Sequence, residues 1–188
     1  MKITGRKSMN EKSRKIGLTV FEISVFSMLG ALMYASKVLM DVLPNVHLIG
    51  VFIVSETIVY RKKALYPLYI FVFLTGLFNG FGLWWIPYLY VWTVLWAMSM
   101  LIPKEWSGKK LVIAGMIVCS LHGFLYGTIY APAQALLFHL NFKGMISWII
   151  AGLPFDALHG AGNLVCGILI APLVSILKKL NKYNFGRN

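Results

Sequence analysis

Long apolar stretches alternate with short polar or basic segments along this chain, and the alternation predicts membrane-spanning helices. Six successive segments are dominated by apolar residues: 16–40, 46–60, 64–79, 88–102, 111–138 and 146–177. About 20 apolar residues are needed to cross a bilayer, so the second segment is short for a span. Pro132 interrupts the fifth segment late in its course. We predict an all-α integral membrane protein with six transmembrane helices in one domain, residues 16–177.

Composition agrees with this pattern. Hydrophobic residues make up 59% of the 188 residues and mean hydropathy is +0.73, which is too apolar for a water-soluble domain. A formal net charge of +12 would suggest nucleic acid in a soluble protein, but here the charges are concentrated between the apolar segments and at the ends of the chain. They therefore report on membrane topology.

The basic residues predict which side of the membrane each connection occupies. If six helices cross the bilayer, all Lys and Arg residues except Lys37 and Lys143 fall on one face, including those of the basic arm at 1–15 and the basic tail at 178–188. Positively charged connections stay in the cytoplasm. We therefore expect both termini to be cytoplasmic.

The segment 152–163 (GLPFDALHGAGN) places polar groups inside the last apolar stretch. Asp156, His159 and Asn163 recur at helical spacing, and Asp156 is the one charged residue between positions 146 and 177. An ionisable group at membrane depth is costly unless it faces a partner or a cavity, so this segment is a candidate binding site. The alternative is that Asp156 only pairs with His159 to hold two helices together.

Two further stripes extend the candidate site. The fifth segment carries His122, Tyr126 and Tyr130 at four-residue steps, and the fourth carries Trp92 and Trp96, preceded by Trp85 in a Gly-rich and Pro-rich loop. Aromatic walls around a few polar groups are typical of sites for organic ligands. Helix packing and an interfacial aromatic belt are the competing explanations for the tryptophans.

Several chemistries lack support in the sequence. Cys119 and Cys166 lie in apolar segments without disulfide or metal spacing, and two histidines with one carboxylate form no adjacent-ligand motif, so no metal site is predicted. The chain has no phosphate-binding loop and no catalytic motif. Glu56 precedes Arg61 and Lys62 closely, and we expect a local ion pair there.

Small residues mark the first apolar segment. Ala31 and Ala35 are four residues apart, with Gly30 beside them. This spacing lets a second helix approach closely, although it is common in apolar helices.

These features together resemble the substrate-binding S components of energy-coupling factor (ECF) vitamin transporters. The resemblance covers nearly the whole chain and rests on its length, the six segments, the Ala31 and Ala35 spacing, the segments 78–92 and 152–163 and the polar site in the later helices. It implies a non-enzymatic subunit of an ABC importer in a bacterial cell membrane. The implied partners are a transmembrane coupling subunit, which would dock on Gly30, Ala31 and Ala35, and two cytoplasmic ATPases that use ATP; no cofactor is implied for this chain.

The ligand of such a subunit would be a vitamin or related micronutrient. Few charges and many aromatic residues favour cobalamin or another bulky, weakly charged ligand, while riboflavin, thiamin, a pyridoxine-type compound and a queuosine precursor stay open. The expected substrate-binding residues are Asp156, His159, Asn163, His122, Tyr126, Tyr130, Trp92, Trp96 and Trp85. The alternatives are a small intramembrane enzyme acting on a lipid or isoprenoid, with His122, Asp156 and His159 as acid and base, and an accessory membrane subunit without a ligand.

Overall fold

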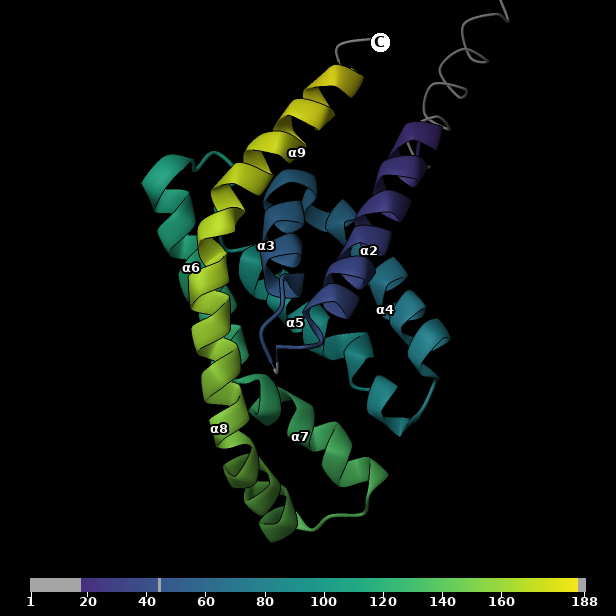
Figure 1. Ribbon diagram of the computed structural model, residues 1–188, viewed down its shortest axis with the longest axis vertical. Coiled ribbons are helices and arrows are strands. Elements are labelled where there is room, and N and C mark those ends of the chain that lie inside the picture. Colours follow the sequence, from purple (N-terminus) through teal and green to yellow (C-terminus); the bar gives the residue numbers. More distant parts are fainter. Residues whose placement is uncertain (1–17, 44, 186–188) are drawn as a thin grey trace, which may run out of the picture.

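The computed structural model describes residues 18–43 and 45–185, with side chains described to residue 182, and these residues form helices and no strand (Figure 1). The predicted basic arm at 1–15 and residues 186–188 of the predicted tail lie outside the described residues. The helices, labelled as in Figure 1, are α2 (Val20–Met40), α3 (Ile49–Tyr60), α4 (Leu65–Asn79), α5 (Tyr88–Ser99), α6 (Gly108–Phe124), α7 (Tyr126–Leu137), α8 (Phe142–Cys166) and α9 (Ile170–Phe185). Three 3₁₀ turns, η1 (Arg61–Ala64), η2 (Leu83–Trp85) and η3 (Gly167–Leu169), join consecutive helices.

Helix α2 begins at a capping box. The Thr19 hydroxyl accepts a hydrogen bond from the Glu22 N–H (3.2 Å), and the Glu22 carboxylate accepts one from the Thr19 N–H (3.0 Å). Two backbone donors that the first helical turn leaves free are thereby satisfied. Glu22 also pairs with Lys63 of η1, which ties the start of α2 to the end of α3.

Within the described part of the chain, three stretches are long and apolar enough to cross a membrane: Val20–Met40, Gly108–Leu137 and Phe142–Lys182. The all-helical, membrane-type character predicted from the sequence is confirmed at this level. Helices α3, α4 and α5 have only 12, 15 and 12 residues, fewer than the roughly 20 that span a bilayer as a straight helix.

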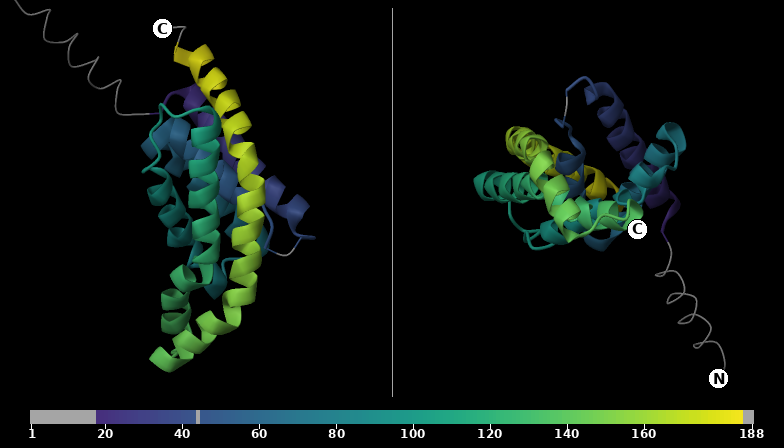
Figure 2. Two further views of the ribbon diagram at one scale, coloured as in Figure 1. Left: turned by 90° about the vertical axis from the view of Figure 1, so that its left-hand side faces the viewer. Right: turned by 90° about the horizontal axis from the view of Figure 1, so that it is seen from below.

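The break in the fifth apolar segment lies at Leu125, and the prediction that Pro132 makes it was wrong. Pro132 lies inside α7, whereas Leu125 ends α6 and precedes α7. The physical reason is that the Gly127 N–H, which would continue the α6 hydrogen-bond ladder, donates instead to the Asp156 carboxylate of α8. As a result α7 turns away from the line of α6 (Figures 1 and 2).

Helix α3 lies at the centre of the molecule, with α2, α5, α6 and α9 around it (Figure 1). Most of its side chains are buried, and a single hydrophobic core joins them to residues of the surrounding helices. Within this core, Phe71, Trp92 and Ile170 are almost fully buried. A short helix of this composition is therefore surrounded by protein on most of its sides.

Three contacts bring the basic segments together at one end of the molecule. Lys63 of η1 pairs with Glu22 near the start of α2. The Arg61 guanidinium donates to the carbonyl of Met100 after α5, and the Lys178 ammonium of α9 donates to the carbonyl of Lys104 before α6. Figure 1 accordingly shows the start of α2 and the end of α9 at the same end.

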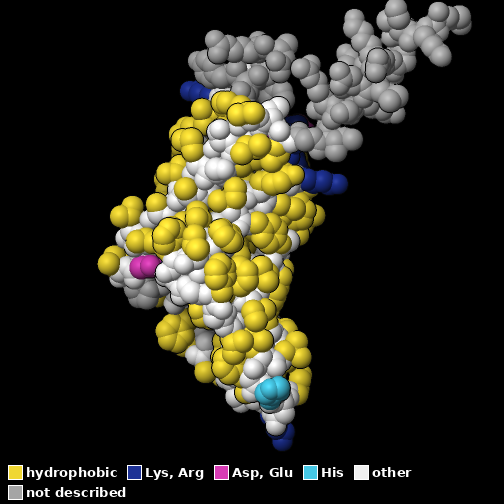
Figure 3. Space-filling view, turned by 90° about the vertical axis from the view of Figure 1, so that its right-hand side faces the viewer, with side chains coloured by type: hydrophobic (Ala, Val, Ile, Leu, Met, Phe, Trp, Pro, Cys, Tyr) yellow, Lys and Arg dark blue, Asp and Glu magenta, His cyan; other side chains and the backbone are white. Residues whose placement is uncertain are grey.

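The outer surface is largely apolar. Figure 3 shows hydrophobic side chains over most of one face, with Lys and Arg concentrated toward its two ends. Large side chains such as Val20, Leu101 and Leu136 are about four-fifths exposed. Such a surface is suited to contact with lipid or with another apolar protein surface.

Helices α6 and α8 approach closely where two glycines meet. A Cβ added at Gly123 would lie 2.8 Å from the backbone Cα and N of Gly160. Backbone cannot move aside as a side chain can, so the two helices need glycine at this crossing.

We expect Gly123→Ala to destabilise the fold by about 1–3 kcal/mol, because the added methyl group forces α6 and α8 apart. Gly152→Ala is the matched control: its Cβ would meet nothing within 4 Å, so alanine should leave stability unchanged or raise it slightly. Thermal unfolding of both variants in detergent measures the difference. Equal melting temperatures for the two variants would contradict the close crossing.

Candidate functional site

A pocket of about 280 Å³ lies where the end of α2, the α2–α3 connection and the starts of α3, α5 and α7 meet the middle of α8. It lies toward the end of the molecule opposite the basic segments, since it includes the last turn of α2 and the first turn of α3. The residues that line it are Lys37, Met40, Asp41, Leu43, Asn45, Val46, His47, Ile49, Tyr88, Trp92, Tyr126 and His159. Trp92, Tyr126 and His159 are the three predicted site residues among them.

Trp92 is the centre of the aromatic wall. Its indole is 1% exposed, and its ring centroid lies 5.6 Å from those of Tyr88 and Tyr126 and 5.8 Å from that of His47. These rings come from α5, α7 and the α2–α3 connection. Edge-to-face and tilted contacts of this kind hold the rings in fixed orientations.

Two histidines meet in the pocket. The ring of His159 from α8 lies 4.8 Å from that of His47, and 5.0 Å from that of Tyr126. His47 lies in the connection outside the helices, and burial lowers its pKa to about 4. Its imidazole is therefore uncharged at neutral pH, with one nitrogen able to donate and the other able to accept.

Three buried polar atoms of the lining residues have no hydrogen-bond partner among the described residues: Nδ1 of His47, Nε2 of His159 and Nε1 of Trp92. Buried polar groups are nearly always satisfied, so these three atoms mark a pocket in which a polar molecule, water included, can bind. An indole N–H can only donate, whereas each imidazole nitrogen can donate or accept, depending on its tautomer.

His122 and Asn163 lie behind the pocket wall. Nε2 of His122 is 3.0 Å from the carbonyl oxygen of Val91, and its ring is 5.8 Å from that of Trp92. The Asn163 amide donates to the carbonyl oxygen of Cys119 (3.1 Å) and so links α8 to α6. Both residues position the wall and do not line the pocket.

Asp156 caps α7. Both carboxylate oxygens accept from the Gly127 N–H, at 3.0 and 3.1 Å, and no hydrogen bond or ion pair joins Asp156 to His159 among the described residues. A carboxylate at a helix N-terminus satisfies a free backbone donor and interacts favourably with the helix dipole. Asp156 therefore contacts the backbone of the preceding helix, and the alternative interpretation, a pairing with His159, is not found among the described residues.

The other three predicted residues lie away from the pocket lining. The Trp85 indole donates to the carbonyl of Val72 (2.8 Å), and the Trp96 indole donates to the carbonyl of Arg61 (3.1 Å) near the basic end. The Tyr130 hydroxyl donates to the carbonyl of Trp84 (2.9 Å), outside the pocket. Each of these contacts ties a connection to a helix.

The small residues of α2 face two directions. Gly30 is buried, and a Cβ there would lie 2.6 Å from the side chain of Ile70 on α4. Ala31 and Ala35 are exposed on the outer face of the helix. The tight contact at Gly30 is therefore internal, whereas the two alanines are accessible from outside.

Nine residues of the pocket lining were not among the predicted site residues, and five of the nine are polar: Lys37, Asp41, Asn45, His47 and Tyr88. Lys37 and Asp41 form an ion pair of 3.2 Å across one turn at the end of α2. The signal for His47 was available, because it is one of only four histidines and follows a break in the apolar pattern. Its contact with His159 could not be inferred, because the two are more than a hundred residues apart.

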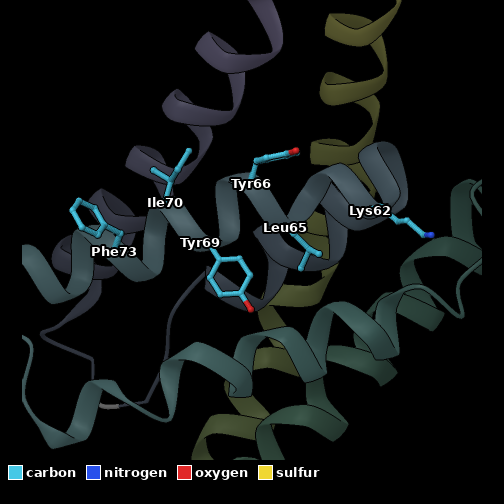
Figure 4. A pocket seen from close by; sticks show the side chains of 6 residues that line it. All are labelled: Lys62, Leu65, Tyr66, Tyr69, Ile70 and Phe73. Carbon is cyan, nitrogen blue, oxygen red and sulfur yellow. The ribbon is translucent and has the colours of Figure 1, made fainter. Parts of the chain in front are cut away.

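Two apolar grooves lie elsewhere on the surface. One, of about 540 Å³, follows the outer side of α4 from Lys62 past Tyr66 and Tyr69 to Phe73 (Figure 4). The other, of about 620 Å³, lies between Leu101 and Val118. Each offers a single lysine as its charged group, so the pocket at Trp92 carries the richer chemistry. No cluster of three or more metal-ligating side chains occurs in the part of the chain that the structure describes.

Comparison with protein-family models, curated proteins and solved structures finds no match to this chain. Function is therefore inferred from the site itself.

We expect Asp156→Ala to destabilise the fold by about 1–2 kcal/mol, because the Gly127 N–H loses its acceptor and α7 loses its cap. Asp156→Asn keeps one side-chain oxygen and should lose less. Thermal unfolding orders the three proteins, and hydrogen exchange at the first turn of α7 locates the change. Wild-type exchange there in Asp156→Ala would contradict the capping role.

Proposed function

We propose that this chain is the substrate-binding membrane subunit of an ECF-type importer and that the pocket at Trp92 binds the imported micronutrient. The observation that carries the proposal is a group of three buried nitrogen atoms around one aromatic pocket, on His47, His159 and Trp92, none of which has a hydrogen-bond partner among the residues that the structure describes. Such a site can hold an organic ring by stacking and by edge hydrogen bonds.

The proposed topology has six crossings, with both termini in the cytoplasm. It is supported by the contacts that join η1, the α5–α6 connection and α9 into one basic end. Helices α3, α4 and α5 would cross as short spans, which thin the bilayer locally or are covered by neighbouring helices. The pocket would then open toward the outside, where an importer captures its ligand.

Pocket size bears on the ligand. Sites for drug-sized molecules have volumes of about 300–1,000 Å³, and this pocket, at about 280 Å³, lies just below that range. A corrinoid such as cobalamin is larger than a drug-sized molecule. Within the proposal we therefore favour a compact, planar heteroaromatic ligand over the cobalamin expected from composition.

The alternative function, an intramembrane enzyme, requires an acid and a base that hydrogen bonds hold in position. The carboxylate of Asp156 is occupied by the backbone of Gly127 and orients neither His122 nor His159. A histidine base is normally oriented by a hydrogen-bonded partner. The geometry therefore supports binding better than acid–base catalysis.

The exposed Ala31 and Ala35 would dock on the transmembrane coupling subunit, which two ATPases drive with ATP. A smooth face of small residues lets two helices approach closely in a membrane. Gly30, which contacts α4, would support this face from inside.

The ligand test is made on the full chain purified in detergent from cells supplied with mixed vitamins. Mass spectrometry of the extract should find one small aromatic compound in stoichiometric amount. With that compound, His159→Gln should weaken binding at least tenfold, about 1.4 kcal/mol, because the Gln amide cannot reproduce the imidazole edge. His139→Gln, at an exposed position, is the matched control and should bind normally. A protein without bound compound that also binds no vitamin on titration would refute the proposal.

The docking test uses transport. Ala31→Trp should leave ligand binding to the isolated chain intact and abolish uptake in cells, because the indole blocks close helix approach. Leu32→Trp is the control, since Leu32 is exposed on the same helix but about 100° further round it. Unchanged uptake by Ala31→Trp, or loss of uptake by both variants alike, would contradict docking at the Ala31 and Ala35 face.

A further inference from the structure

Glu56 is a carboxyl group buried in the middle of the core. It lies on the central helix α3, is 0% exposed, and neither of its carboxyl oxygens has a hydrogen-bond partner among the described residues. The hydroxyl groups beside it are used elsewhere: Ser55 donates to the carbonyl of Ile170, and Thr57 donates to that of Ile53. No donor from its own helix reaches Glu56.

The ion pair expected from the sequence is absent among the described residues. The Arg61 guanidinium donates to the carbonyls of Ile102 (2.8 Å) and Met100 (2.6 Å). Lys63 pairs with Glu22, and Lys62 lies at the surface on the groove of Figure 4. The nearest titratable group along α3 is Tyr60, one turn further on. The basic turn after α3 therefore leaves Glu56 without a counter-charge.

The other helices around α3 supply no counter-charge for Glu56 either. Helix α5 contains no charged residue. On α6, His122 is held by the carbonyl of Val91, and Lys109 and Lys110 are exposed at its start. On α8, Asp156 caps α7 and His159 lines the pocket.

The remaining charges lie at the ends of α2 and α9. Lys37 of α2 pairs with Asp41 at the pocket end. Lys178 of α9 donates to the carbonyl of Lys104, while Lys179 and Lys182 are exposed. Every cation that the described part of the chain places near α3 is thus engaged or at the surface.

An ionised carboxylate in such a place is strongly disfavoured. Removing a charge from water without a partner costs several kcal/mol even after relaxation, which is comparable to the whole stability of a domain. A carboxylic acid carries no net charge and costs far less to bury.

We propose that Glu56 is a proton-binding site. In this packed arrangement of α3 its side chain is an uncharged carboxylic acid, and it passes its proton to water only when α3 separates from its neighbours. Ile49, seven residues earlier and about 10 Å away along the helix, lines the ligand pocket. A movement of α3 that opens the pocket and admits water therefore releases one proton, and a closing movement takes one up. This site does not depend on the identity of the ligand.

Infrared spectroscopy of the full chain in detergent at neutral pH tests the protonation directly. The wild type should show a carboxylic-acid C=O band that shifts in D₂O, and Glu56→Gln should lack it. Asp156→Asn and Glu22→Gln, at the other buried carboxyl groups, should each retain it. If Glu56→Gln does not fold, the assignment is made by elimination: the band should persist in single amide variants of each of the other acidic residues, Glu11, Glu22, Asp41, Glu105 and Asp156. Absence of the band in the wild type, or its persistence in folded Glu56→Gln, would overturn the proposal.

The pH dependence of unfolding gives an independent measurement. Above about pH 5 the unfolded chain releases this proton while the folded chain keeps it, so the wild type should lose stability as the pH rises. Relative to Glu56→Gln, its unfolding constant should increase by up to tenfold per pH unit. Parallel pH profiles for the two proteins would show that the folded chain does not retain the proton.

Discussion

The hydrogen bonds from the Gly127 N–H to the Asp156 carboxylate organise the half of the molecule that contains the aromatic pocket. They end the ladder of α6 at Leu125 and start α7 in a new direction. This turn places Tyr126 beside Trp92 and His159, so the aromatic wall depends on it. A Cβ at Gly127 would lie 2.5 Å from Oδ2 of Asp156, so a larger residue there would displace the carboxylate from these hydrogen bonds.

Polar groups inside this protein fall into two kinds. Ser120 donates to the carbonyl of Gly160, and Asn163 donates to that of Cys119, so both serve to join α6 and α8. His47, His159 and Glu56 instead have buried atoms for which the described part of the chain supplies no hydrogen-bond partner. In an apolar environment a polar group with a hydrogen-bond partner stabilises the fold, whereas a buried polar group without a partner destabilises it. The two kinds divide atoms and not whole residues, because Nδ1 of His122 and Oδ1 of Asn163 also lack partners among the described residues, although the other polar atom of each side chain joins two helices.

Hydropathy alone predicted the positions of the helices well, because every residue of a segment that lies in lipid or in the core contributes to its apolar pattern. The ends of α2, α4 and α5 lie within a few residues of the predicted ones. Contacts between distant residues could not be read in this way. The hydrogen bond from the Gly127 N–H to the Asp156 carboxylate places the break in the fifth segment at Leu125. The Arg61 guanidinium donates to a carbonyl after α5 and does not pair with Glu56. For the site, helical spacing found Trp92, Tyr126 and His159, while His47 came from a connection that has no periodicity.

The length of the last helical rod has a mechanical consequence. The stretch from Phe142 to Lys182 contains 41 residues, about 60 Å of helix, roughly twice the thickness of a bilayer core. The turn η3 divides it, and α7 is attached to the far part, α8 (Figure 2). With α8 about 37 Å long, a bend of roughly 10° at η3 moves its far end by about 6 Å. The rod would therefore act as a lever arm: the same bend would move the pocket residue His159, about 12 Å from η3, by about 2 Å, and the α7–α8 connection at the far end by about three times as much.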